Sequence, residues 1–141
     1  MTVSIMYFGN QELICQLKKS EIGALIDFIN QRNYPENSII TADRGYESYN
    51  LIAHCIENNQ KFVFRVKDIS TRNGIMTSLS LPDETFDITV TRTLTNLQTK
   101  EVKKNESNQF VFVPSTSVFD YLDACNHFYD LRSRIVRFKN S

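Results

Sequence analysis

One carboxylate in this sequence stands where it could take part in chemistry. Asp43 directly follows the apolar, β-rich residues 38–42 (SIITA), and Gly45 comes two residues later. An aspartate at a strand end can hold a divalent ion, because carboxylate oxygens are hard ligands suited to Mg²⁺. The plainer interpretation is a turn, since Asp-Arg-Gly is ordinary turn chemistry. Two-metal phosphodiester chemistry would need further carboxylates from elsewhere.

The elements that would position Asp43 alternate between strands and helices. Strands are expected at residues 2–8, 38–42 and 61–66, and helices at 20–31 and 48–59, with Ser20 and Ser48 as N-caps. Helices of this length between strands imply parallel pairing in an α/β sheet. In that sheet, residues 38–42 are expected to be buried on both faces. Chemistry gathers at the carboxyl ends of such strands, where Asp43 is expected.

The second half of the chain has a different character. Polar residues 70–83 predict a loop, and the alternating, threonine-rich residues 85–95 predict a half-exposed strand. Further strands are expected at 110–113 and 128–139. We therefore divide the chain into an α/β region, residues 1–69, and a β-rich region, residues 70–141.

Several side chains near the aspartate suit a nucleic acid. Arg44 can donate a forked pair of hydrogen bonds to phosphate, and Tyr46 can stack on an unpaired base. Either residue can instead brace the loop. Arg65 and Lys67 are expected on one face of their strand, opposite its phenylalanines. That face either contacts DNA phosphates or is an ordinary solvated surface.

A second basic group lies near the end of the printed sequence. Arg132 and Arg134 are expected on one face of a strand, and Arg137 and Lys139 on the other, unless a bulge resets the alternation. These residues form a phosphate track, or they protect an exposed strand from aggregation. The sequence leaves both interpretations open.

The composition excludes other kinds of protein. An apolar fraction of 41% is enough for a packed core, and the zero net charge allows only a local basic track. No apolar run approaches the ~20 residues of a membrane span, and no signal peptide is evident, so a cytoplasmic protein without a membrane partner is expected. The three cysteines predict neither a disulfide framework nor a metal site. The two histidines lack the spacing of metal ligands.

Residues 39–68, IITADRGYESYNLIAHCIENNQKFVFRVKD, resemble the second-acid block of DDE transposases of the insertion-sequence-4 type. In that block a strand ends in Asp, then come Arg-Gly-Tyr/Phe-Glu-Ser, a helix, and a strand ending in Phe-Val-x-Arg-x-Lys. Residues 128–139 are similar to the family's basic strand, and residues 19–31 to the helix ahead of the second acid. Between residues 70 and 127 the similarity is loose.

The resemblance implies a partial ribonuclease H-like core at residues 1–69 and a β-rich insertion at 70–141. The family's three acids bind two divalent ions, Mg²⁺ or Mn²⁺, that activate water or a DNA 3′-hydroxyl for attack on a phosphodiester. By this resemblance Asp43 is the second acid, both catalytic and metal-binding. The partner is transposon-end DNA, with the expected contacts at Arg44, Tyr46, Arg65, Lys67, Arg132, Arg134 and Arg137.

The chain departs from the family pattern at two places. Neither the first acid nor the final glutamate of a Tyr-x-x-Arg-x-x-x-Glu motif is found in it. We therefore expect an internal fragment that is inactive alone, and whose exposed apolar surface could drive homodimerisation. Two alternatives remain open: a remnant that binds DNA or a transposase without cutting, and another metal phosphohydrolase using Glu47 or Asp68.

Overall fold

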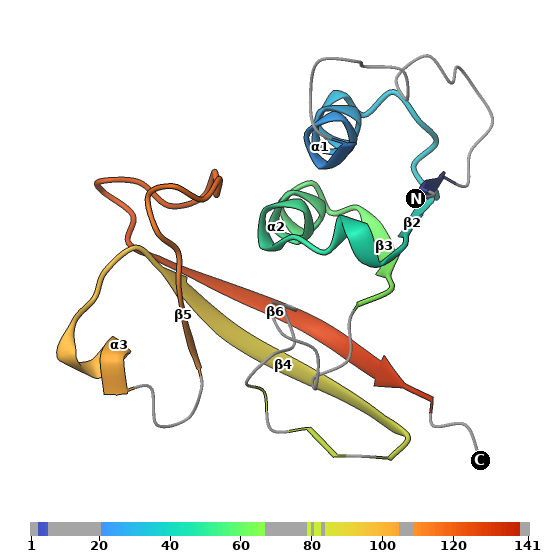
Figure 1. Cartoon of the computed structure of the whole chain (residues 1–141). Coiled ribbons are helices and arrows are strands. Elements are labelled where there is room, and N and C mark those ends of the chain that lie inside the picture. The colour runs from blue at the N-terminus through green and yellow to red at the C-terminus, as the bar shows by residue number, and fades with distance from the viewer. Residues whose placement is uncertain are drawn as a thin grey trace. The chain divides into compact units, whose positions relative to one another are not determined.

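The computed structural model of the chain describes residues 3–5, 21–66, 79, 81–82, 84–104 and 109–138. It contains two compact units, Met1–Thr77 and Ser78–Ser141 (Figure 1). Both helices and strands are present, as expected for an α/β chain. The division expected between residues 69 and 70 stays a prediction, because residues 67–78 lie outside the described ranges.

The first unit is built on a three-stranded sheet in the order β1-β2-β3. The strands are β1 (Val3–Ile5), β2 (Ile39–Ala42) and β3 (Lys61–Phe64). β2 and β3 are parallel, as predicted, with Ile39 opposite Lys61. β1 runs antiparallel to β2, so the prediction of parallel pairing is wrong for this strand. The connection from β1 to β2 is long, and a long connection can return the chain in either direction.

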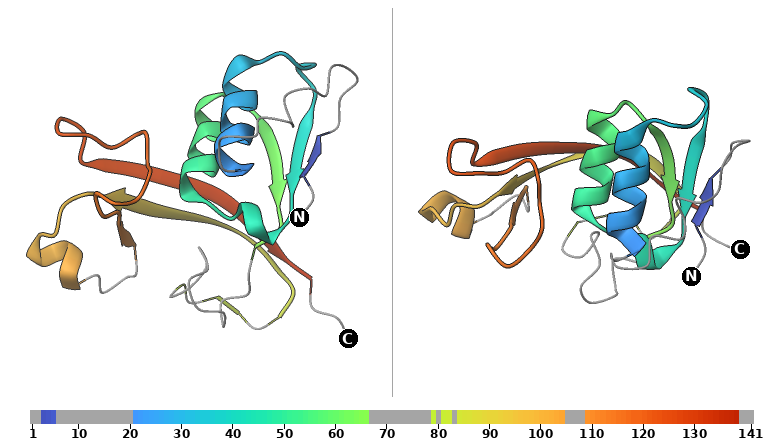
Figure 2. Two further views of the ribbon diagram at one scale, coloured as in Figure 1. Left: turned by 45° about the horizontal axis from the view of Figure 1, so that its top comes forward. Right: turned by 90° about the horizontal axis from the view of Figure 1, so that it is seen from above.

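Two helices of the first unit cover one face of this sheet (Figure 2). They are α1 (Glu21–Gln31) and α2 (Tyr49–Glu57). Their apolar sides form a core with β2, which contributes the buried Ile40 and Ala42. Ile39 and Thr41, on the other face of β2, are only half-buried. Burial of this strand on both faces is therefore wrong, because α1 and α2 pack on the same side.

The ends of α2 follow from its sequence. The Ser48 hydroxyl accepts a hydrogen bond from the Leu51 N–H at 3.3 Å, which confirms the predicted N-cap. Asn58 caps the carboxyl end, and Asn59 has a φ of 53°. Asparagine tolerates this left-handed conformation better than most residues. The cap predicted at Ser20 lies outside the described residues.

The second unit is a ribbon of two long strands with a short third one. Its elements are β4 (Phe86–Thr95), α3 (Lys100–Lys104), β5 (Phe110–Phe112) and β6 (Phe128–Arg137). β4 lies between β5 and β6. It is antiparallel to β6 over ten unbroken residue pairs, and parallel to β5. α3 was not predicted; the Thr99 hydroxyl accepts from the Val102 N–H at its start.

No helix in the described part of the chain is long and apolar enough to cross a membrane.

Candidate functional site

Asp43 directly follows β2, at the carboxyl end of the parallel pair β2–β3. The Arg65 N–H donates a hydrogen bond to the Ala42 carbonyl at 2.9 Å, so the chain leaving β3 runs beside the chain leaving β2. Both Asp43 and Arg65 are exposed. The strand-end position expected for the carboxylate is therefore confirmed, and a basic residue stands at the same edge of the sheet.

The backbone after Asp43 forms a short 3₁₀ helix, Arg44–Tyr46, that this aspartate caps. Its Oδ1 accepts from the Arg44 N–H at 2.8 Å, and its carbonyl accepts from the Tyr46 N–H at 3.0 Å. These two hydrogen bonds are those of a turn, as the plainer interpretation of Asp43 predicts. Capping leaves the side chain exposed, so the carboxylate is open to a ligand from solvent.

Tyr46 lies on the inner side of this turn. Its side chain is 5% exposed and belongs to the core between the sheet and the helices. Burial, followed by a hydrogen bond with the Glu21 side chain at the start of α1, raises the pKa of Tyr46. Of the two interpretations of Tyr46, bracing the loop matches this position, because a ring packed in the core presents no free face to a base.

Arg44 and one face of β3 are exposed near the end of the sheet where Asp43 lies. Lys61, Val63 and Arg65 are exposed, whereas the two phenylalanines of β3 are half-buried. This alternation is the predicted one. It leaves Arg65 and the exposed Arg44 available to an anion near the carboxylate. Lys67 lies outside the described residues.

The arginines of β6 divide between two faces as predicted, because the pairing with β4 contains no bulge. Arg132 and Arg134 are both exposed, on the same face. The Arg134 guanidinium forms a two-point ion pair with the Asp87 carboxylate of β4, with one Nε–Oδ1 distance of 2.8 Å. This pairing lowers the pKa of Asp87. Arg137, on the other face, is half-buried and donates to the Pro82 carbonyl at 3.4 Å.

A complete metal centre does not occur among the residues that the structure describes. No group of three His, Cys, Asp or Glu side chains there is placed to hold an ion. Asp43 fits one ligand position, since it is an exposed carboxylate at a strand end. Both histidines hydrogen-bond asparagine side chains instead, His54 to Asn30 and His127 to Asn96.

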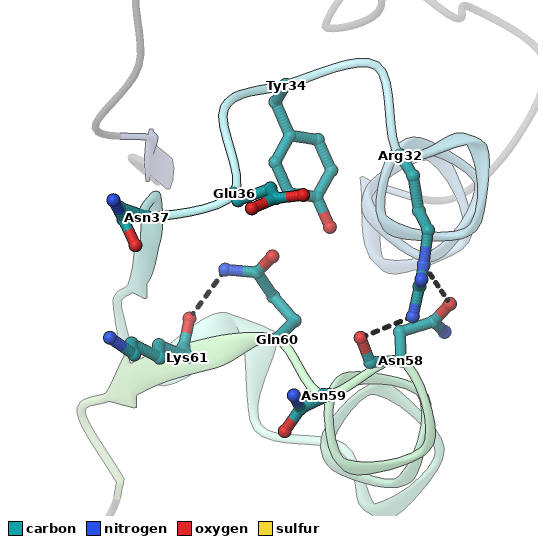
Figure 3. A pocket seen from close by; sticks show the side chains of 8 residues that line it. All are labelled: Arg32, Tyr34, Glu36, Asn37, Asn58, Asn59, Gln60 and Lys61. Carbon is teal, nitrogen blue, oxygen red and sulfur yellow. Dashed lines mark hydrogen bonds between the residues drawn. The ribbon is translucent and has the colours of Figure 1, made fainter.

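A polar pocket of about 550 Å³ lies at the opposite edge of the sheet, where β2 and β3 begin and the helices end (Figure 3). The Arg32 guanidinium donates to the Asn58 carbonyl at 2.6 Å and so ties α1 to α2. The Gln60 amide donates to the carbonyls of Ser38 and Lys61, at 2.6 and 2.9 Å. The sequence did not indicate this pocket, because the polar residues that line it lie at the ends of four different helices and strands.

Comparison with known proteins gives one finding. The model of the family described as "Transposase DDE domain" matches residues 16–123. Neither the curated proteins nor the solved structures contain a match to the chain.

Proposed function

The chain belongs to the transposase DDE domain family, and we propose that within it the chain is of the insertion-sequence-4 type. Residues 1–69 would form part of a ribonuclease H-like core and residues 70–141 a β-rich insertion. The chain would take part in cut-and-paste transposition of an insertion sequence. The reaction is strand cleavage and joining at the transposon ends by metal-dependent phosphoryl transfer. Family members act on DNA and generally use divalent metal ions.

The observation that carries this proposal is the position of the Asp43 carboxylate. It is exposed at the carboxyl end of β2, beside the end of the parallel strand β3. Functional groups of open α/β sheets gather at this edge. The cap formed with Arg44 holds the side chain at the strand end without burying it. We assign Asp43 the role of the second acid of the family.

In this role Asp43 holds one divalent ion, Mg²⁺ or Mn²⁺, together with acids that lie elsewhere. An ion held there would supply positive charge that stabilises the transition state of phosphoryl transfer. Arg44 follows Asp43 in the chain, and the Arg65 backbone lies beside the end of β2. Both side chains are exposed, so they would bind phosphates next to the reacting one. Lys67 is proposed to extend this contact. Tyr46 braces the turn from inside the core.

The arginines of β6 form a second contact with DNA in this proposal. Arg132 and Arg134 project from one exposed face, and Arg137 from the other. Arg132 is the most available of the three, because Arg134 is paired with Asp87 and Arg137 bonds a backbone carbonyl. Binding through these residues is sequence-independent and weakens with salt, as counterions compete for the phosphates.

Paramagnetic Mn²⁺ tests the assignment of Asp43 directly. Titrating Mn²⁺ into isotope-labelled chain should broaden the amide resonances of Arg44, Gly45 and Arg65 first. The same titration of Asp43→Asn should broaden them no more than other surface amides. Equal broadening in both proteins, or broadening centred on a different carboxylate, would remove the metal role of Asp43.

Cleavage is the second part of the test. The proposal is that the 141-residue chain alone does not cut DNA, because one acid cannot hold two metal ions. Incubation of supercoiled plasmid with the chain and Mg²⁺ should therefore leave the plasmid intact. Nicking by the chain, and not by Asp43→Ala, would show that the remaining acids lie within the 141 residues.

A second candidate function is DNA binding without cutting, or binding to a transposase. The exposed arginine face of β6 favours it, because this face needs no metal ion to bind phosphate. In that case a DNA fragment would be retarded in a salt-dependent way that neither a chelator nor Asp43→Ala changes. Retardation that requires Mg²⁺ and Asp43 would favour the transposase site instead.

A further inference from the structure

The polar pocket where β2 and β3 begin contains one buried amide, that of Gln60, whose side chain is 8% exposed. Its Nε2 donates to the carbonyls of Ser38 and Lys61 at 2.6 and 2.9 Å, which accounts for both amide hydrogens. These bonds fix the orientation of the amide, because a reversed amide would bring its oxygen against two carbonyl oxygens. Gln60 Oε1 is therefore an acceptor of fixed position, and Figure 3 shows it turned into the pocket.

Gln60 Oε1 accepts no hydrogen bond from any residue that the structure describes. A buried acceptor without a donor is unfavourable, so such an oxygen indicates that a donor comes from outside the protein. The pocket has room for one, since its volume of about 550 Å³ is within the range of small-molecule sites. A ligand for this pocket should therefore carry at least one N–H or O–H donor.

Further features of the pocket favour a positively charged donor. The Glu36 carboxylate also lines the pocket, and it forms no hydrogen bond or ion pair with the described residues. Arg32 and Asn58, which directly follow α1 and α2, line the pocket as well. The carbonyl end of a helix carries a partial negative charge that attracts cations. Together with the fixed oxygen of Gln60, these groups suit a protonated amine.

Arg32 supplies the opposite charge in the same pocket. Its Nε and Nη2 donate to the side-chain oxygen and the carbonyl of Asn58, at 3.3 and 2.6 Å. Its Nη1 has no acceptor within the described ranges, so two N–H groups remain for an anion. Arg32 also has a φ of 54°, in the left-handed region where a helix commonly ends in glycine. An arginine is unfavourable in this conformation, which indicates that its side chain has a role in the pocket.

We propose that this pocket binds a free α-amino acid with a polar side chain. The ammonium group of the ligand donates to Gln60 Oε1 and to the Glu36 carboxylate. Its carboxylate accepts hydrogen bonds from Nη1 of Arg32, in a charge-assisted contact. The side chain of the ligand is polar, because no aliphatic residue lines the pocket and the carboxamides of Asn37 and Asn59 do.

Ligands of a single charge fit the pocket less well. A phosphate would pair with Arg32, but it would leave Gln60 Oε1 without a donor and would meet the Glu36 carboxylate. A simple amine would satisfy both acceptors and would be repelled by the guanidinium. An amino acid carries both charges on neighbouring atoms, so it meets an opposite charge at each end. Lys61 is left out of the site, since Figure 3 shows its ammonium group directed away from Gln60.

This site is separate from the one at Asp43. β2 and β3 are parallel, so Asp43 lies where the strands end and the pocket lies where they begin. Binding of an amino acid needs neither a metal ion nor DNA. Failure of the pocket to bind would leave the proposed function untouched, and loss of metal binding at Asp43 would leave the pocket intact.

Titration of isotope-labelled chain with L-glutamine, followed by NMR, measures the binding. The side-chain amide of Gln60 and the backbone amide of Asn59 should shift in a saturable way. N-acetyl-L-glutamine, which lacks the ammonium group, should bind at least about tenfold more weakly, because each charge-assisted contact contributes strongly. L-leucine should also bind more weakly than L-glutamine. No shift of these resonances at ~10 mM L-glutamine, enough to saturate a site with a Kd of ~1 mM, overturns the proposal.

Two variants test the two ends of the ligand. Glu36→Gln should weaken the binding of L-glutamine about tenfold, whereas Glu101→Gln, an exposed acid on α3 outside the pocket, should not change it. Arg32→Gly suits the left-handed backbone and removes the guanidinium. It should weaken L-glutamine but not the α-amide of L-glutamine, which has no carboxylate; melting curves confirm that each variant is folded. Equal binding of L-glutamine and its N-acetyl form, or shifts caused by inorganic phosphate and not by L-glutamine, would show that no amino-acid site exists here.

Discussion

Two substitutions at Asp43 separate its role as a cap from its role as a metal ligand. Asparagine keeps a side-chain oxygen that can accept from the Arg44 N–H, whereas alanine does not. Neither substitute carries the negative charge that a divalent ion requires. Asp43→Asn should therefore preserve the fold and lose the metal, while Asp43→Ala should lose both the cap and the metal.

The expected difference in stability between the Asn and Ala variants depends on the hydrogen bond by which Asp43 caps the 3₁₀ helix. Loss of an N-cap acceptor costs ~1 kcal/mol in an α-helix, and Asn and Asp are nearly equal caps. The 3₁₀ helix after Asp43 has only three residues and the bond is exposed, so we expect the lower part of that range, about 0.5–1 kcal/mol. A domain of the size of Met1–Thr77 loses about 4–8 °C in Tm per kcal/mol. Asp43→Ala should thus lower its Tm by about 2–8 °C, and Asp43→Asn by much less.

Circular dichroism provides the melting curves, and Mn²⁺ line broadening provides the ligand measurement on the same samples. Ser48→Ala is a suitable control, because Ser48 caps α2 and should lower the Tm without changing Mn²⁺ binding. The reasoning is refuted if both Asp43 variants destabilise the chain equally and Mn²⁺ broadens all four proteins alike. Asp43 would then be a structural turn residue and no ligand.

Four further predictions concern the core and the ribbon. Ile29→Ala, at a fully buried position of α1, should lower the free energy of unfolding by about 2–5 kcal/mol in a urea titration; an unchanged midpoint would contradict the core described. Burial raises the pKa of the Cys55 thiol to about 12, so a thiol reagent should label the exposed Cys125 in native chain and leave Cys55 unlabelled. In the unfolded chain this thiol ionises near its ordinary pKa of 9.0. The contribution of Cys55 to the free energy of unfolding should therefore be complete below pH 9 and fall as the pH rises from 9 toward 12. Cys55→Ala should reduce this fall. Asp87→Asn should release Arg134 for phosphate, strengthen DNA binding and steepen its salt dependence by about one phosphate contact; weaker binding would show that the ion pair positions the arginine instead.

Much of the local structure was predictable from short stretches of sequence. The serine before α2 and the in-and-out alternation of β3 were expected and are present. The division of the β6 arginines between two faces was also expected. Each of these features depends on residues within one turn of helix or along one strand, where steric and hydrogen-bonding preferences act directly.

Features that join distant segments were not predictable in the same way. β1 lies antiparallel to β2. Within the described residues no helix packs on the second face of β2, because α1 and α2 both pack on the first. Arg134 pairs with Asp87, and Arg32 closes the end of α2, across long sequence separations. These contacts cannot be predicted from a local pattern, because the sequence around a charged residue does not indicate which distant residue it will pair with.

The sequence by itself determined that a carboxylate follows a short apolar strand, and that basic residues recur near it and along a later strand. Only the tertiary structure decided that Asp43 is exposed while Tyr46, three residues later, is buried against α1. Only the structure placed the Arg65 backbone beside the end of β2 and, among the described residues, made β6 an edge strand of its sheet. The physical reason is that propensity and alternation act between neighbours, whereas exposure and pairing depend on which segments remain to cover each surface.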